Sequence, residues 1–73
     1  MRVKIDSIQR QFGKNVKKYR LKGGLTQEQL AEKTGIDYKY VQRIEGKTPP
    51  NATLQTLAKL AKILKIDVWK LLK

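Results

Sequence analysis

The residues between Thr26 and Asp37 most narrowly limit what this chain can fold into. Thr26 is followed three positions later by Gln29, which is the T-x-x-Q form of the capping box and marks the start of a helix. Gly35 is expected to end that helix, and Asp37 offers a new N-cap only two residues later. Two short helices must therefore meet at a sharp angle across a turn.

Small and aliphatic side chains around this turn predict how the two helices pack. Ala31 is small where the second helix crosses closely, and Gly35 has no Cβ because the turn needs a positive φ. The inward-facing residues are expected to be Leu30, Ala31, Thr34, Ile36, Val41, Ile44 and the aliphatic part of Glu45. The outward-facing residues of the second helix are then Tyr38, Lys39, Gln42 and Arg43. A rigid helix is thus predicted to present a polar, basic and aromatic face.

Hydrophobic periodicity predicts a longer helix ahead of this pair. Its apolar residues recur at intervals of three and four, and they are Ile5, Ile8, Phe12, Val16 and Tyr19. Asp6 or Ser7 is expected to cap its start. The helix is expected to end near Leu21, because Gly23 and Gly24 supply residues that tolerate a positive φ.

Two further helical segments are predicted after a proline-containing loop over residues 47–51. Thr53 is expected to cap a fourth helix, whose broad apolar face comprises Leu54, Leu57, Ala58, Leu60, Ala61 and Leu64. Asp67 is expected to cap a last short helix over Val68–Leu72. The predicted fold is therefore all-α, a compact five-helix bundle forming one domain over residues 1–73, in which the second and third helices make a helix-turn-helix.

Composition excludes most enzyme chemistry. The chain has neither cysteine nor histidine, which removes disulfides, thiolate nucleophiles and the usual ligands of structural zinc. No Ser-centred triad and no Gly-rich phosphate loop is recognisable, so an enzyme is the least expected class and no cofactor or metal is expected. No apolar run approaches the roughly 20 residues of a membrane-spanning helix, so an intracellular chain without a membrane partner is expected.

The charge balance makes nucleic acid the first partner to consider. Lys and Arg number 17 against 6 Asp and Glu, a formal net charge of +11 at neutral pH. Such a chain repels itself unless a polyanion is nearby. A basic surface can also serve solubility alone, so the decision rests on the spacing of the residues described above.

The segment from Gly24 to Ile36 carries a family resemblance. Its sequence, GLTQEQLAEKTGI, resembles the helix-turn-helix of the Cro/CI-type (XRE) repressor family. Residues 54–66 and 68–72 are similar to the fourth and fifth helices of that family, and Phe12-Gly13 and Ile36-Asp37 are similar to controller proteins of restriction-modification systems. The resemblance implies a lambda-repressor-like fold. It also implies a transcriptional regulator, a repressor or controller of bacterial, archaeal or phage type, that binds double-stranded DNA sequence-specifically in the cytoplasm and associates with the nucleoid.

The resemblance also implies roles for individual residues. The positions that reach base edges are Tyr38, Lys39, Gln42 and Arg43. The phosphate contacts are Thr26, Gln27, Tyr40, Lys47 and Asn51. Arg20 and Glu45 are implied to form a buried ion pair with a structural role. The chain departs from the family at Tyr38, where a small residue, Arg or Gln is usual, and at Glu45-Gly46, where one more residue is usual between the glutamate and the glycine.

The C-terminal apolar residues support two interpretations. They are Val68, Trp69, Leu71 and Leu72. They could close the core, or they could form a dimer contact, because an exposed apolar cluster usually meets a partner. We expect the dimer contact, and with it a homodimer on a palindromic operator.

Three alternatives stay open at the level of sequence. The chain could be an antitoxin-like protein-interaction module that also binds DNA, or a basic amphipathic protein whose lipid affinity depends on Trp69 and the lysines. The helix-turn-helix spacing is also compatible with a helical hairpin that binds no DNA. No small-molecule ligand is indicated.

Overall fold

Four α-helices and one short 3₁₀ helix make up the described part of the chain, and no strand occurs there. The computed structural model describes residues 5–73, and their side chains from Ser7 onward. The helices are α1 (Ile5–Lys22), α2 (Gln27–Thr34), α3 (Tyr38–Ile44), α4 (Leu54–Leu64) and the 3₁₀ helix η1 (Val68–Leu71). The all-α class agrees with the prediction. The predicted fifth helix is only a four-residue 3₁₀ segment, which the side chain of Asp67 does not cap.

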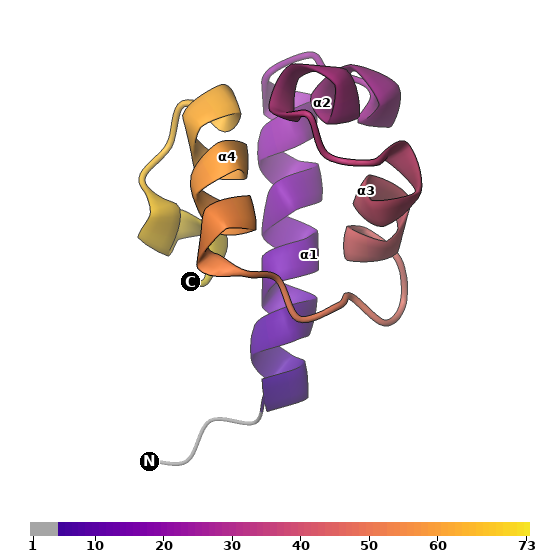
Figure 1. Ribbon diagram of the computed structural model, residues 1–73. Coiled ribbons are helices and arrows are strands. Elements are labelled where there is room, and N and C mark those ends of the chain that lie inside the picture. The colour runs from indigo at the N-terminus through magenta and orange to yellow at the C-terminus, as the bar shows by residue number, and fades with distance from the viewer. Residues whose placement is uncertain (1–4) are drawn as a thin grey trace.

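Helix α1 forms the long axis on which the other elements pack. Figure 1 shows α2 lying across the C-terminal end of α1, with α3 on one side of α1 and α4 on the other. η1 packs against both α1 and α4. The chain between α3 and α4 returns past the N-terminal half of α1, where the side chain of Gln9 hydrogen-bonds that of Asn51.

The hydrophobic core lies where the four α-helices and η1 converge. Its members are Phe12, Val16, Leu30, Ala31, Val41, Ile44, Leu57, Leu60, Ala61 and Leu71. Every described element contributes at least one of them. A chain of this length buries only a small core. Because every described element contributes to this core, the elements fix one another's positions.

The start of α1 differs from the prediction, whereas its end agrees to within one residue. The helix includes Asp6 and Ser7, so neither residue is its N-cap. At the other end it reaches Lys22, and only Gly24 of the two glycines has a positive φ, of 71°. The side chain of Ile5 lies outside the described residues, and Ile8 is 38% exposed, so the buried stripe begins at Phe12.

Helix α4 starts at the predicted cap but buries a narrower face than predicted. The Thr53 hydroxyl accepts a hydrogen bond from the backbone N–H of Thr56 at 3.1 Å. Leu54 was expected on the buried face, yet its side chain is 83% exposed. Ala58 is also exposed. Helix α4 packs mainly on α1, α2 and η1, and its first residue, Leu54, lies outside the core.

Buried Asn15 ties the C-terminal segment to α1. Its Nδ2 donates to the backbone oxygen of Leu71 at 2.9 Å, and its Oδ1 accepts from Gln11 Nε2 at 3.1 Å. Leu71 is thereby held with no exposed surface. Burying an amide costs little free energy when its N–H group and its oxygen are both hydrogen-bonded, and these bonds fix the positions of its partners. The C-terminal turn therefore closes the core.

Candidate nucleic-acid interface

The caps predicted for the helix pair α2 and α3 are present with good geometry. The Thr26 hydroxyl accepts from the backbone N–H of Gln29 at 3.0 Å, and the side-chain Oε1 of Gln29 accepts from the backbone N–H of Thr26 at 2.8 Å. Gly35 has a φ of 76° and ends α2. Asp37 then accepts from the N–H of Lys39 at 2.8 Å. The helix-turn-helix geometry thus follows from side chains that act within a few residues of each other.

Helix α3 divides its residues between the core and solvent as predicted. Val41 and Ile44 are fully buried. The four residues predicted to read bases are all exposed, and they are Tyr38, Lys39, Gln42 and Arg43. Because α3 is anchored by its buried side, its exposed side is a rigid surface with two cations, a carboxamide and a phenol.

A buried ion pair fixes how α1 and the helix pair meet. Arg20 Nε donates to Glu45 Oε2 at 2.7 Å, and Arg20 Nη2 donates to Glu45 Oε1 at 2.9 Å. The two side chains are 9% and 3% exposed. A third bond runs from Arg20 Nη1 to the backbone oxygen of Leu25 at 2.8 Å. This two-pronged geometry is the strong form of the Arg–carboxylate contact, so the end of α3 is held against the end of α1.

Gln27 takes part in the same network. Its Nε2 donates to Glu45 Oε1 at 3.1 Å, which links the start of α2 to the end of α3. The sequence did not indicate this contact, because the partners are 18 residues apart. One N–H of the carboxamide remains for an outside acceptor, since the nitrogen carries two hydrogens.

A groove runs between the start of α2 and the start of α3. Its lining includes Thr26, Gln27, Glu28 and Tyr38. The first N–H groups of a helix have no acceptor within the helix, and they carry a partial positive charge. The Thr26 hydroxyl accepts the cap bond and keeps its own hydrogen to donate. The groove therefore offers several donors to an anion beside the exposed face of α3.

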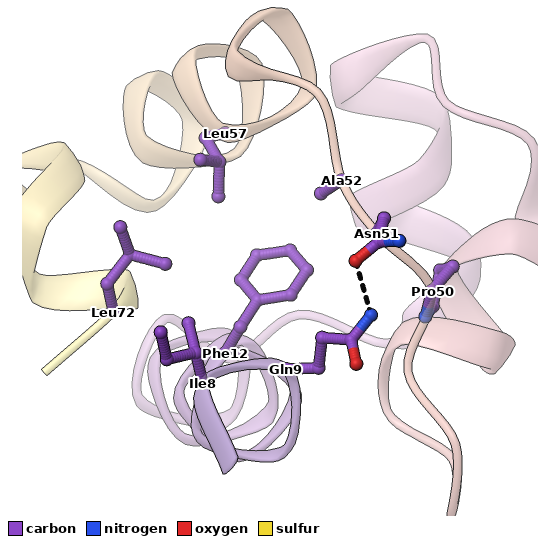
Figure 2. A pocket seen from close by; sticks show the side chains of 8 residues that line it. All are labelled: Ile8, Gln9, Phe12, Pro50, Asn51, Ala52, Leu57 and Leu72. Atoms are coloured by element: carbon purple, nitrogen blue, oxygen red, sulfur yellow. Dashed lines mark hydrogen bonds between the residues drawn. The ribbon is translucent and has the colours of Figure 1, made fainter. Parts of the chain in front are cut away.

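Three other predicted phosphate contacts lie around the loop after α3. The Tyr40 hydroxyl donates to the backbone oxygen of Asn51 at 3.4 Å, and the Asn51 side chain accepts from Gln9. Figure 2 shows the Gln9–Asn51 bond at the rim of a small apolar pocket around Phe12. Lys47 is exposed in the same loop. Tyr40 thus ties the loop to α3, and the Asn51 side chain ties it to α1.

The C-terminal residues predicted as a dimer contact do not form one set. Leu71 has no exposed surface, so the expectation that it contacts a second chain is wrong; the bond from Asn15 turns it into the core. Val68, Trp69 and Leu72 are 40%, 54% and 43% exposed. Leu71 thus closes the core, whereas the other three side chains stay accessible to solvent.

A hydrogen bond between two of the residues predicted to read bases was not anticipated. Gln42 Nε2 donates to the Tyr38 hydroxyl at 3.2 Å on the exposed face of α3. The sequence did contain a signal for this contact, because Tyr38 and Gln42 are four residues apart and residues i and i+4 are neighbours on a helix.

Residues 5–73 contain neither a metal-binding cluster nor a membrane-spanning helix. No cluster of three or more His, Cys, Asp or Glu side chains there could hold a metal ion. Within the same residues, no helix is long and apolar enough to cross a membrane.

Comparison with known proteins shows the family. The family model described as Helix-turn-helix matches residues 16–68, which include α2, the turn and α3. The chain belongs to the helix-turn-helix family. The resemblance to Cro/CI-type (XRE) regulators is thereby confirmed.

Individual members of the helix-turn-helix family are similar over most of the chain. Control protein C.SmaI of Serratia marcescens is 46% identical over 61 residues, which cover 84% of this chain and 71% of C.SmaI. The HTH-type transcriptional regulator SinR of Bacillus subtilis is 35% identical over 61 residues, and this chain spans 55% of its length.

Solved structures of helix-turn-helix proteins show the same fold. The restriction-modification controller protein C.AhdI from Aeromonas hydrophila superimposes with a TM-score of 0.81 and 34% identity, covering 89% of this chain and 97% of C.AhdI. The biofilm master regulator SinR, solved in complex with DNA, gives a TM-score of 0.81 and 34% identity, covering 85% of this chain and 98% of that one.

Proposed function

We propose that this chain is a sequence-specific double-stranded DNA-binding protein that regulates transcription, as a repressor or controller. The observation that carries the proposal is the exposed face of α3. It is braced from behind by the core and by the Arg20–Glu45 pair, and it displays Tyr38, Lys39, Gln42 and Arg43. The relatives named above are a control protein and transcriptional regulators, and one was solved with DNA.

Helix α3 is the element that would enter the major groove. An α-helix fits that groove, and each base pair presents a distinct set of donors and acceptors there. Arg43 can donate two hydrogen bonds to guanine N7 and O6, and Lys39 lies one turn earlier on the exposed side. These residues would supply the preference for particular bases.

Phosphate contacts would set the register of the protein on the duplex. The proposed residues are Thr26, Gln27, Tyr40, Lys47 and Asn51. The start of α2 supplies free N–H groups to an anion, and the net charge of +11 favours association with any duplex. These contacts would give affinity without base preference.

A symmetric dimer would present two copies of α3 to a palindromic operator. The exposed C-terminal residues Val68, Trp69 and Leu72 are the proposed contact. Two half-sites would then lie about 34–36 Å apart, which is one turn of B-DNA. A regulator of this kind would act in the cytoplasm, on the DNA of the nucleoid.

Selection of bound sequences from a random duplex pool at two salt concentrations tests this function. A base-reading protein enriches one motif at both salts, whereas a polycation loses affinity at high salt and enriches nothing. A dimer further predicts a motif with two inverted halves. A pool without enrichment at physiological salt would overturn the proposal.

A further inference from the structure

The base-reading face of α3 contains a pair of side chains that already contact each other. Tyr38 and Gln42 lie one helical turn apart, and Gln42 Nε2 donates to the Tyr38 hydroxyl at 3.2 Å. Both residues are exposed, and Tyr38 is 39% accessible. Tyr38 is itself the first residue of α3, directly after the Asp37 cap. Its ring is therefore placed by a well-fixed helix start.

The hydrogen bond leaves the useful part of the Gln42 carboxamide free. An amide nitrogen has two hydrogens, and the bond to Tyr38 uses one of them. The second hydrogen and the carbonyl oxygen remain. Adenine presents an acceptor, N7, and a donor, N6, in the major groove, and glutamine pairs with both at once. The remaining groups of Gln42 match this edge.

Fixing the carboxamide before binding matters because ordering a free glutamine side chain costs more conformational entropy than ordering most other side chains. Restricting such a side chain on binding opposes association. A partner that holds the amide before DNA arrives reduces this loss, and it leaves the carbonyl oxygen and one N–H of the amide free. Lys39 and Arg43 are donors only and have no acceptor to offer, so neither distinguishes adenine in this way.

We propose that Gln42 reads an adenine in the operator and that Tyr38 is the residue that positions its carboxamide. This inference rests on the proposed function and names one base of the target. Tyr38 acts through Gln42 in this assignment, and its own hydroxyl hydrogen stays available for a phosphate.

A helix-stabilising pair would have a different signature. Side chains at i and i+4 that merely stabilise α3 would change the affinity for every duplex by the same factor. A positioning residue changes the preference at one base position. The test must therefore compare the affinities for duplexes that differ only in the base at one position, because overall affinity does not separate the two roles.

The experiment measures affinities of the full chain for the selected motif and for its single-base variants. Gln42→Ala is expected to reduce the preference for adenine over the other bases at one position of the motif. The ratio of affinities at that position should fall by about fivefold to hundredfold. Tyr38→Phe keeps the ring and removes the hydroxyl, and it is expected to lose part of the preference at that same position. In the Gln42→Ala background Tyr38→Phe should have no further effect there. Circular dichroism establishes that each variant is folded.

Two controls isolate the hydroxyl. Tyr40→Phe removes a hydroxyl from the same helix that bonds Asn51 instead of Gln42, so it should lower affinity for all duplexes alike and keep the base preferences. Replacing the adenine by 7-deazaadenine removes the N7 acceptor without any change to the protein. The wild-type chain should then lose affinity by a larger factor than the Gln42→Ala variant.

The outcomes separate this inference from the function on which it rests. If the wild-type chain enriches no motif, both fail. If a motif is enriched but Gln42→Ala relaxes a position with another base, or none, only the inference fails. The inference alone also fails if Tyr38→Phe lowers the affinity by the same factor whichever of the four bases stands at that position.

Discussion

Arg20 and Glu45 show how single residues can serve the site without touching a ligand. Their charges are buried and satisfied by each other, by Gln27 and by the backbone at Leu25. Removing one partner from a buried pair leaves an uncompensated charge, which costs about 3–5 kcal/mol. Variants of this pair therefore report on folding. Variants on the exposed face of α3, by contrast, are expected to report on the proposed DNA binding.

Arg43 provides the sharper test at the scale of one residue. Arg43→Ala should lower affinity for the selected motif by about 1–3 kcal/mol and relax the preference for one guanine, because two hydrogen bonds to that base are lost. Competition binding against single-base variants measures this. Gln27→Ala is the matched comparison, and it should weaken all duplexes alike because its proposed contact is a phosphate. Equal losses on motif and random DNA for Arg43→Ala would contradict the base-reading role.

Helices α1 and α3 can pack closely only because position 13 is a glycine. A Cβ built at Gly13 would lie 2.3 Å from the backbone oxygen of Ile44 and 2.9 Å from Cγ of Pro49. The first atom belongs to the last residue of α3 and the second to the loop after it. Gly13 thus sets the distance at which α1 supports α3.

Gly13→Ala should destabilise the chain by about 1–3 kcal/mol, since an overpacked contact forces the backbone to move. The sign of the change in the free energy of unfolding is informative, because Gly→Ala inside a helix otherwise stabilises the protein by about 1 kcal/mol. Chemical denaturation followed by circular dichroism measures the change. Gly23→Ala is the control, as its Cβ would meet only ordinary contacts of 3.5 Å or more. A Gly13→Ala variant as stable as the wild type would show that α3 is not held at this distance.

At the scale of the whole molecule, the exposed apolar residues of η1 belong to a different element from the exposed face of α3. Trp69 is 54% exposed on η1, and the Nζ atoms of Lys70 and Lys73 lie 5.8 and 5.2 Å from its ring centroid. η1 packs on α1 and α4, whereas α3 packs on α1 and α2. A second chain at η1 would therefore leave α3 free for DNA.

Trp69→Gln should convert the proposed dimer to a monomer, because it removes the largest exposed apolar side chain without changing the charge. Sedimentation equilibrium gives the mass, and affinity for a half-site should be retained while affinity for the full palindrome falls. Leu54→Gln removes another exposed apolar side chain, on α4, and should leave the dimer intact. A monomeric wild-type chain, or a dimer that survives Trp69→Gln, would contradict the assignment.

Much of the helix-turn-helix could be predicted because its determinants act locally. The capping box at Thr26, the positive φ at Gly35 and the cap at Asp37 all form as predicted, and each depends on residues within about one helical turn. The outward face of α3 followed from helical periodicity in the same way.

Tertiary structure decided the features that depend on which neighbours cover a surface. Leu54 and Leu71 both belong to apolar patterns, yet one is 83% exposed and the other fully buried. Asn15 explains the second case, since its bond to the Leu71 backbone joins residues 56 positions apart. The sequence by itself determined where α2 begins and ends and where α3 and α4 begin, because the caps at these positions act over short range. Which faces are buried, and how closely α1 approaches α3, required the packed molecule, because those contacts join residues that only the fold brings together.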